Sequence, residues 1–387
     1  MNKPAIRLAL TALAAVPLGA WQETLTREGP FWVQSIAGVE SGNPSGRLRV
    51  STRGRVTVTG GAEEQIRYTF TKKVKARSEA DARRLLGQYL VKTSRQGDLS
   101  IINVIHAGDG PATAEMSVVA PRTLRDVSIE TFGGSMEATE LNGALKAYTG
   151  GGRIRLDRIG GQVFARTAGG EIVLGAVGDA VRCISAGGPI RADSIRGEAR
   201  LETAGGEITL REVEGPVYAS TAGGGIEIGR AGATVVVNTA GGAIEVGSAR
   251  GMVTAETSGG PIHVGAASSV KCETGGGAIR LTNVTGSLRA STAVGNIFAT
   301  LLAGAVAESF LSTGAGDITV FLPANLAITI HAQNDSAFDT RRIVSEFPGV
   351  VVKRQGVLVM AEGDINGGGP VLRLASTGGR IYIKKAQ

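Results

Sequence analysis

Glu227 and Glu245 are the residues whose type and spacing best suit acid–base chemistry. The step in the chain from Glu227 to Glu245 is the same as the step from Glu245 to His263. If each step is one coil of a stacked β-structure, these side chains share a column, about 4.8 Å apart. A retaining glycosidase holds its two carboxyl groups about 5–5.5 Å apart. The pair is therefore a candidate for glycan cleavage, although any charged repeat also brings some acids together without a catalytic role.

A second set of residues with the same spacing could bind a ligand. Arg182, Arg200 and Tyr218 follow one another at this same interval. On adjacent coils they would form a strip of cations beside an aromatic ring, which suits an acidic glycan. An ordinary mixed outer face would show the same residue types, so the strip is a hypothesis about binding.

Metal, phosphate and nucleic-acid sites lack their usual motifs. Calcium-binding solenoids place an Asp in each turn, but here the Gly pairs precede Arg153, Glu171, Pro189 and other mixed residues. No Gly-Lys-Ser/Thr sequence follows a Gly pair, which argues against a phosphate loop. The formal net charge of +7 is spread along 387 residues without basic blocks. We therefore expect no metal, no cofactor and no nucleic-acid partner.

These candidates depend on an internal repeat that dominates the chain. A Thr or Ser, here called the anchor, begins a Thr-Ala-Gly-Gly-x-Ile motif or a close variant, and an apolar residue follows five positions later. The first eight anchors are evenly spaced, and three more follow at the same or a nearly equal interval: Thr131, Thr149, Thr167, Ser185, Thr203, Thr221, Thr239, Thr257, Thr274, Thr292 and Thr313. Such a fixed period indicates a stacked repeat protein.

Within one repeat, apolar and polar residues alternate with the period of a strand. In residues 199–213, Leu201, Ile208 and Leu210 would point inward, with the charged residues outside. Gly pairs between the two strands require either a positive φ or a close approach of two backbones. We predict an all-β, parallel β-solenoid of about 18-residue, two-strand coils, with the Thr column forming a hydroxyl ladder beside the turns.

Two cysteines test this register. Cys183 and Cys272 each lie two residues before an anchor, in the inward column, and are five coils apart. At about 4.8 Å per coil they would be about 24 Å apart, whereas a disulfide needs Cα atoms within about 7 Å. We therefore predict two free, buried thiols.

The flanks differ from the repeat and are expected to close its ends. Residues 1–20 have a short basic region, an apolar stretch and small residues, the pattern of a signal peptide. Residues 21–130 are predicted to form an N-terminal β cap with one helix at 78–92, capped by Ser78. Residues 131–320 hold the coils, and 321–387 continue the solenoid and cap it. No later segment is apolar for the ~18 residues that a membrane span requires.

The chain resembles a bacterial family of exported domains of unknown function, described as putative adhesins. The resemblance covers roughly residues 45–387 and includes the Gly-Arg-Val-Thr-Val-Thr-Gly sequence at 54–60, the helix that interrupts the early strands, the Gly-Gly-x-Ile coils and the ending at 366–383. It implies a stacked β-solenoid outside the cytoplasm and supplies no catalytic residues.

These observations predict a non-catalytic, exported protein that presents a rigid β-solenoid surface for adhesion, for binding or as an envelope scaffold. Its location would be the periplasm, the cell surface or the extracellular medium. Repetitive flat faces favour an extended glycan or a cell-surface protein over a small molecule. The alternative is a polysaccharide-active enzyme, a lyase or glycosidase of the β-helix type, which would use Glu227 and Glu245.

Overall fold

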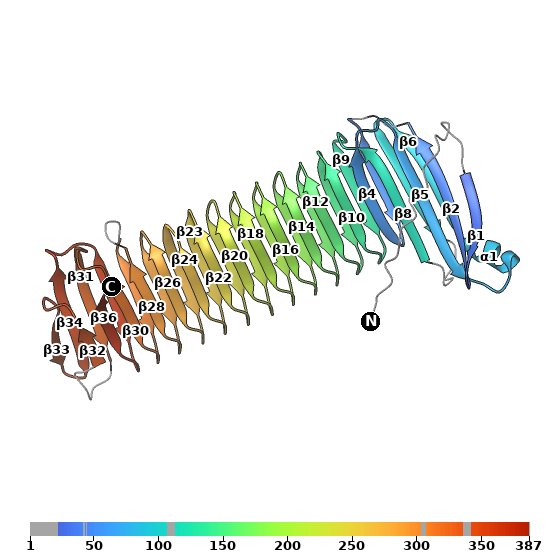
Figure 1. The fold of residues 1–387 in the computed structure, drawn as a ribbon. Helices are drawn as coiled ribbons and strands as arrows, with labels where there is room; N and C mark the ends of the chain where they lie inside the picture. Colours follow the sequence, from blue (N-terminus) through green and yellow to red (C-terminus); the bar gives the residue numbers. More distant parts are fainter. Residues whose placement is uncertain are drawn as a thin grey trace, which may run out of the picture.

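A computed structural model describes residues 22–386 except 42, 44, 107–112, 303–306 and 336–341. The predicted signal peptide at 1–20 lies outside the described residues. The chain forms a long rod with a broader N-terminal end (Figure 1). Two sheets of 18 strands each run along the rod and face each other across its core. The prediction of a parallel β-solenoid with a helix-containing N-terminal β cap is confirmed.

Each regular coil contributes one strand to each sheet, which we call sheet A and sheet B. The coil strands of sheet A follow the Gly pairs: β10 (Met136–Leu141), β12 (Ile154–Ile159), β14 (Ile172–Val177), β16 (Ile190–Ile195), β18 (Ile208–Val213), β20 (Ile226–Ala231), β22 (Ile244–Ala249), β24 (Ile262–Ala266), β26 (Ile279–Val284), β28 (Ile297–Leu301) and β30 (Ile318–Leu322). Those of sheet B end at the anchors: β9 (Asp126–Thr131), β11 (Ala144–Thr149), β13 (Val163–Thr167), β15 (Val181–Ser185), β17 (Ala199–Thr203), β19 (Val217–Thr221), β21 (Val235–Thr239), β23 (Met252–Thr257), β25 (Ser269–Thr274), β27 (Leu288–Thr292) and β29 (Ser309–Thr313).

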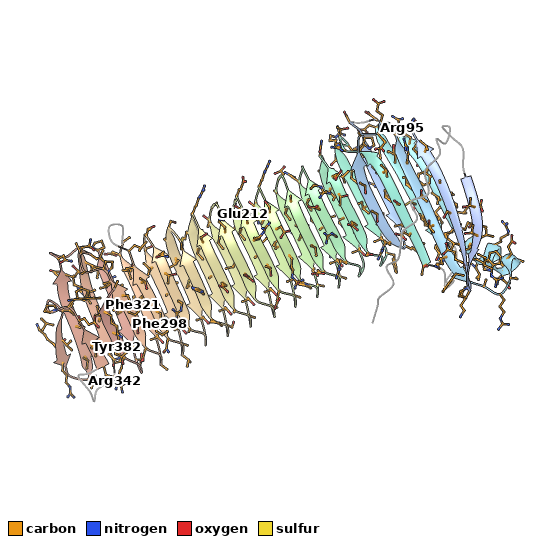
Figure 2. All side chains as sticks on the ribbon, viewed as in Figure 1. Arg95, Glu212, Phe298, Phe321, Arg342 and Tyr382 are labelled. Carbon is orange, nitrogen blue, oxygen red and sulfur yellow. The ribbon has the colours of Figure 1, made fainter. Side chains whose placement is uncertain are left out.

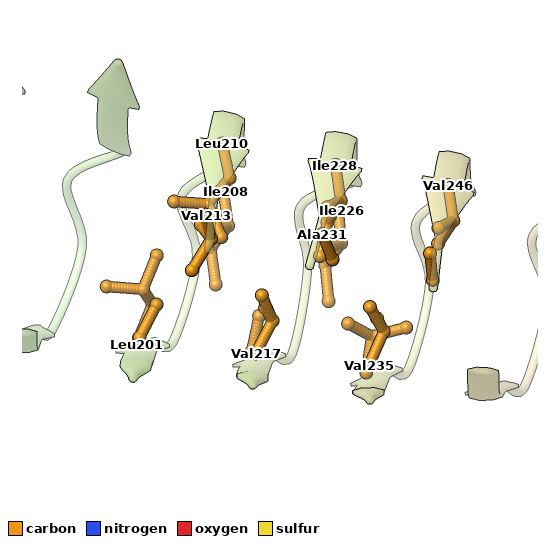
Figure 3. Close-up of a cluster of buried hydrophobic side chains, with 14 of the residues drawn as sticks. Leu201, Ile208, Leu210, Val213, Val217, Ile226, Ile228, Ala231, Val235 and Val246 are labelled. Carbon is orange, nitrogen blue, oxygen red and sulfur yellow. The ribbon is translucent and has the colours of Figure 1, made fainter. Parts of the chain in front are cut away.

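The strands of neighbouring coils pair in parallel, and equivalent repeat positions lie side by side. Ile208 is in register with Ile226, and Thr203 with Thr221. Inward side chains of the two sheets meet between them, as the cluster around Leu201, Leu210 and Ile228 shows (Figure 3). Burial of these apolar columns, together with continuous pairing between coils, holds the rod together.

The second glycine of each pair allows two turns to approach closely. A Cβ on Gly206 would lie 2.3 Å from the carbonyl oxygen of Gly188 in the preceding coil, whereas a Cβ on Gly205 would meet nothing closer than 3.7 Å. Among the described residues, glycines with positive φ occur only in the flanks. Of the two reasons expected for the Gly pairs, close approach therefore applies to the second glycine, and neither reason applies to the first. In two coils the first glycine of the pair is replaced, by Val294 and by Ala315, whereas the second glycine is kept.

Both ends of the rod depart from chain order. The N-terminal cap consists of β1 (Gln22–Glu28), β2 (Phe31–Glu40), β5 (Ile66–Lys75), β8 (Thr113–Pro121) and β4 (Arg55–Gly61) in sheet A, and of β6 (Tyr89–Gln96), β7 (Leu99–His106) and β3 (Arg47–Thr52) in sheet B. The β3–β4 coil lies between β7–β8 and β9–β10. After β4 the chain therefore runs toward the N-terminal tip of the rod through the antiparallel strands β5 and β6. It then returns through β7 and β8 and continues the solenoid at β9.

The C-terminal end has the same arrangement. Its strands are β36 (Ile381–Lys385) and β32 (Ile343–Ser345) in sheet A, and β35 (Val371–Ser376), β31 (Ile328–Asn334), β34 (Leu358–Ile365) and β33 (Val351–Gln355) in sheet B. The last coil, β35–β36, pairs with β29–β30 on one side and with β31–β32 on the other. The final segment of the chain is thus an interior coil, and the preceding segment closes the end.

The single helix, α1 (Glu79–Leu86), packs against β5 and β2. The Ser78 hydroxyl accepts a hydrogen bond from the Asp81 amide at 3.2 Å, as the capping prediction required. The buried Lys72 ammonium donates to the carbonyls of Leu86 at 2.9 Å and Tyr89 at 3.1 Å, at the end of the helix. The helix is shorter than the predicted 78–92, because the chain leaves the helix at Gly87 and the Tyr89 ring turns into the cap core as β6 begins.

Candidate functional site

A lengthwise depression runs along the outside of sheet B, and we call it the axial groove. It consists of three hollows with volumes of about 470, 440 and 890 Å³. The first two hollows share Ile184 and Ser185, and the second and third share Asn238. The groove therefore extends over the coils from Glu130 to Ala293 without leaving sheet B and its adjoining turns.

The repeat itself builds this groove. In the first and third hollows the lining comes from three positions of each coil: the outward residue before the anchor, the anchor, and the small residue after it. The middle hollow is also lined by residues earlier in the strand, such as Arg200 and Tyr218. Ala168, Ala204 and Ala240 are typical of the position after the anchor, and small side chains there leave the depression open. Phe132 is the exception at the N-terminal end. Its ring is 78% exposed, and the Arg53 guanidinium lies 5.5 Å from the ring centre.

The chemistry of the lining changes along the rod. Near the N-terminal end, Tyr148 lines the groove, and its ring lies 5.5 Å from the Phe164 ring. In the middle, the Ser220 hydroxyl donates to the side-chain oxygen of Asn238 at 2.7 Å. Toward the C-terminal end the charged groups in the lining are carboxylates, Glu256 and Glu273. The groove thus offers aromatic rings with both basic and acidic groups at its N-terminal end and middle, and hydroxyl, amide and acidic groups toward its C-terminal end.

The predicted strip of Arg182, Arg200 and Tyr218 is brought together on sheet B, with the three residues in register on β15, β17 and β19. The Arg200 guanidinium lies 4.5 Å from the centre of the Tyr218 ring, a cation–π contact. A hydrogen bond to Glu198 raises the pKa of Arg200 further above its ordinary value. Arg200 and Tyr218 line the middle hollow. Arg182 instead lies 6.0 Å from the Phe164 ring and 4.0 Å from a Glu202 carboxylate oxygen.

The sequence alone did not reveal the groove, although it located part of its wall. Tyr148 and Asn238 carry no signal in the sequence, because their residue types are unremarkable at outward positions. The available signal was the run of Ala, Gly and Ser just after the anchors, which leaves the corner of the coil without bulk.

The carboxylate pair Glu227 and Glu245 lies on the opposite sheet, on β20 and β22. The two residues are direct neighbours in register. The nearest Glu245 oxygen is 3.8 Å from the His263 ring nitrogen. Glu227 lines a hollow of about 400 Å³ with Arg191 and Arg211, and Glu245 is outside it. The structure therefore brings the pair together on an exposed face, where Glu227 lines this hollow and Glu245 does not.

The remaining candidates for chemistry in the described ranges are metal ligands and the two cysteine thiols. No group of three or more His, Cys, Asp or Glu side chains that could hold a metal ion occurs there. Cys183 on β15 and Cys272 on β25 are free and buried, five strands apart in sheet B. Burial raises the pKa of both thiols, that of Cys272 to about 12. A raised thiol pKa disfavours the reactive thiolate.

Lys271 lies between two acids of the groove. Its ammonium is 3.2 Å from Glu273 and 3.4 Å from Glu256. The pKa of Lys271 is raised above its usual range, mainly by the hydrogen bond to Glu273 and the charge of that carboxylate. Glu256 adds a smaller effect in the same direction. The cation lowers the repulsion between the two neighbouring carboxylates, which are in register on β23 and β25.

Comparison with known proteins gives only distant similarity. No family model and no curated protein matches the chain. A cell adhesion protein from Clostridium sporogenes, described as putative, is 9% identical over 95% of this chain and 100% of its own, with a TM-score of 0.17. Putative adhesins from Bacteroides fragilis and Parabacteroides distasonis are 10% and 8% identical, each over 91% of this chain and 97% of their own, with TM-scores of 0.23 and 0.27.

The names of these structures agree with the resemblance stated from the sequence. At such identities and TM-scores they carry no argument about what the chain binds, and the fold assignment rests on its own strand pairing. No helix within the described residues has the length and apolar character needed to cross a membrane.

Proposed function

We propose that the protein is an exported, non-catalytic binding protein of the adhesin type that holds an extended ligand in the axial groove. The observation that carries this proposal is the continuity of the groove over many coils, with hollows that share lining residues. A small molecule is better held by an enclosed cavity. A polymer or an extended peptide segment instead gains from many weak contacts along one line, and a rigid rod keeps those contacts in register.

The lining favours a hydroxyl-rich chain such as a glycan over a purely apolar one. Tyr148 and Tyr218 supply ring faces, and Ser220 and Asn238 supply donors and acceptors. An extended segment of a cell-surface protein would use the same groups. Export agrees with the signal-like pattern at 1–20 and places the groove where such ligands occur.

The test is a glycan array probed with the mature protein and two variants. Ser220→Trp fills the middle of the groove, and Ser194→Trp adds the same bulk at a half-buried, outward position of sheet A. We expect Ser220→Trp to weaken binding at least about tenfold and Ser194→Trp to leave it unchanged. Equal loss in both variants would contradict the groove as the binding site.

The enzymatic alternative makes a different prediction. A polysaccharide-active protein would release products from a bound glycan, and Glu227→Gln with Glu245→Gln would abolish that release. Both carboxylates are exposed, and only Glu227 lines the hollow of sheet A, which favours binding without turnover. Product release that the double variant eliminates would replace the binding proposal with the enzymatic one.

A further inference from the structure

A second surface with aromatic and basic groups lies on sheet A near the C-terminal end of the rod. Phe298, Phe321 and Tyr382 come from β28, β30 and β36, which are consecutive strands of that sheet. Figure 2 shows the three side chains close together there. Phe298 and Phe321 belong to consecutive coils, and Tyr382, which is far from both in the chain, joins them because the last coil is inserted beside β30. We call this surface the aromatic platform.

The rings lie over the sheet. Thr319 occupies an outward position between Phe298 and Tyr382 in the register, yet it is only 8% exposed. Other outward threonines of sheet A, such as Thr209 and Thr282, are half-buried, so the fuller burial of Thr319 indicates that the flanking side chains cover it. The three rings are themselves half-buried. Each ring is therefore partly covered and partly open to solvent, and none of the three projects fully from the sheet.

Two cations flank the platform. The Arg280 guanidinium lies 5.3 Å from the Phe298 ring centre, and the Lys384 ammonium lies 5.5 Å from the Tyr382 ring centre. Neither forms an ion pair within the described part of the chain, whereas Arg200 on sheet B lies against Glu198. An unpaired cation next to an aromatic face keeps its charge available for a ligand anion.

We infer that the aromatic platform is a second binding site, for an acidic polysaccharide. Sugar rings present apolar C–H faces that stack on Phe298 and Tyr382, which are two strands or about 9.6 Å apart. The carboxylates or sulfates of the polymer pair with Arg280 and Lys384. The site is on the sheet opposite to the axial groove and does not depend on the function proposed for that groove.

An anionic membrane surface is the competing partner for aromatic and basic side chains. Membrane-binding aromatic and aliphatic side chains must reach the boundary between headgroups and acyl chains, about 5–10 Å deep. Half-buried rings that lie over a rigid sheet do not provide that reach. The geometry therefore favours stacked sugars.

The experiment is affinity electrophoresis in native gels that contain polygalacturonate, a carboxylated polymer, or neutral dextran. Two double variants remove the proposed contacts: Arg280→Gln with Lys384→Gln, and Phe298→Leu with Tyr382→Leu. Leucine keeps an apolar cover over Thr319, and melting curves verify that each variant is folded. The matched controls on sheet B are Lys146→Gln with Arg289→Gln for the charges, and Phe310→Leu for a half-buried outward ring.

We expect polygalacturonate, but not dextran, to retard the protein. Each platform variant should raise the dissociation constant at least about tenfold, while the controls and Ser220→Trp retain wild-type retardation. Salt near 1 M should weaken binding, because it shortens the screening length to about 3 Å.

Three outcomes would overturn the inference. Equal loss in the sheet B charge control would show non-specific attraction to positive charge. Loss of polygalacturonate binding in Ser220→Trp would assign the polymer to the axial groove. Co-sedimentation with phosphatidylserine vesicles, with no retardation by polygalacturonate, would identify a membrane-binding surface.

Discussion

The Thr203 hydroxyl donates a hydrogen bond to the Gly188 carbonyl of the preceding coil, at 3.0 Å. The Thr203 hydroxyl oxygen in turn accepts a hydrogen bond from the Gly206 amide, at 3.3 Å. Equivalent pairs recur along the rod, for example at Thr221, Thr239 and Thr292. The anchors therefore connect each coil to the turn before it through glycine carbonyls, and not to each other as the expected hydroxyl ladder would.

This relationship predicts the effect of removing one anchor hydroxyl. Thr203→Val keeps the shape of the side chain but leaves the buried partners of the hydroxyl unsatisfied, so we expect a loss of about 1–3 kcal/mol in the free energy of unfolding. Thr203→Ser retains the hydroxyl and should lose at most about 1 kcal/mol. Urea denaturation followed by circular dichroism measures both. A valine variant as stable as the wild type would contradict the role of the bond.

The two glycines of one turn should differ sharply. Gly206→Ala forces a Cβ against the Gly188 carbonyl oxygen, where only 2.3 Å is available, so we expect a destabilisation of about 3 kcal/mol. Gly205→Ala meets no atom closer than 3.7 Å and should change stability by less than about 1 kcal/mol. The same denaturation assay decides, with Gly205→Ala as the control. Similar losses in both would show that the close approach is not the reason for the glycine.

The coil register could be predicted from the sequence because one period governs it. Glu227 pairs with Glu245, and Arg200 with Tyr218, as the spacing of the repeat required. The ends could not be predicted in the same way. Strand alternation shows that Val371–Ser376 is a strand, but it does not tell that this strand lies beside β29 instead of at the tip of the rod.

The candidate site was predictable only in part, for a related reason. Columns of the repeat tell which side chains are neighbours, so the Arg200–Tyr218 contact could be anticipated. A groove depends on the relative height of adjacent columns, and that height is set by the turn after the anchor. The aromatic platform could not be predicted from the sequence, because Tyr382 joins Phe298 and Phe321 only through the inserted last coil.

The buried thiols predict a loss of stability in alkali. An unperturbed thiol with a pKa of 9.0 ionises above that pH in the unfolded chain, whereas burial raises the pKa of Cys272 to about 12 and that of Cys183 in the same direction. Above pH 9 the folded state therefore binds more protons than the unfolded state, and stability falls as pH rises.

The variant Cys183→Ala with Cys272→Ala should fall less steeply between pH 9 and 11. Alanine already fills this column at Ala165 and Ala255, so the fold is kept. Tyr68 and Lys72 also titrate in alkali, but they are present in both proteins and cancel in the comparison. Denaturation midpoints across pH provide the measurement, and identical slopes would refute the assignment. In native wild-type protein, intact mass should show two free thiols, and an intramolecular bridge would overturn the register.

Removing the last coil should be far more damaging than removing an internal one. Truncation after Pro370 deletes β35 and β36, exposes the edges of β29 and β30, and separates the closing strands from the rod. We expect aggregation and rapid proteolysis. Excision of 235–252 joins Thr234 to Val253, which occupies the same register position as Val235, and should leave a shorter, folded rod. Size-exclusion chromatography and limited proteolysis compare the two, and a well-folded truncation would contradict the prediction.

The insertion of the last coil has a mechanical consequence. In a simple stack, a force applied at the chain end would peel away the outermost coil one bond at a time. Here the C-terminal strands are clamped between β29–β30 and β31–β32, so tension at that end must break the pairing on both sides. The resistance of this end to unfolding under force therefore comes from two strand interfaces that must separate together, and not from one.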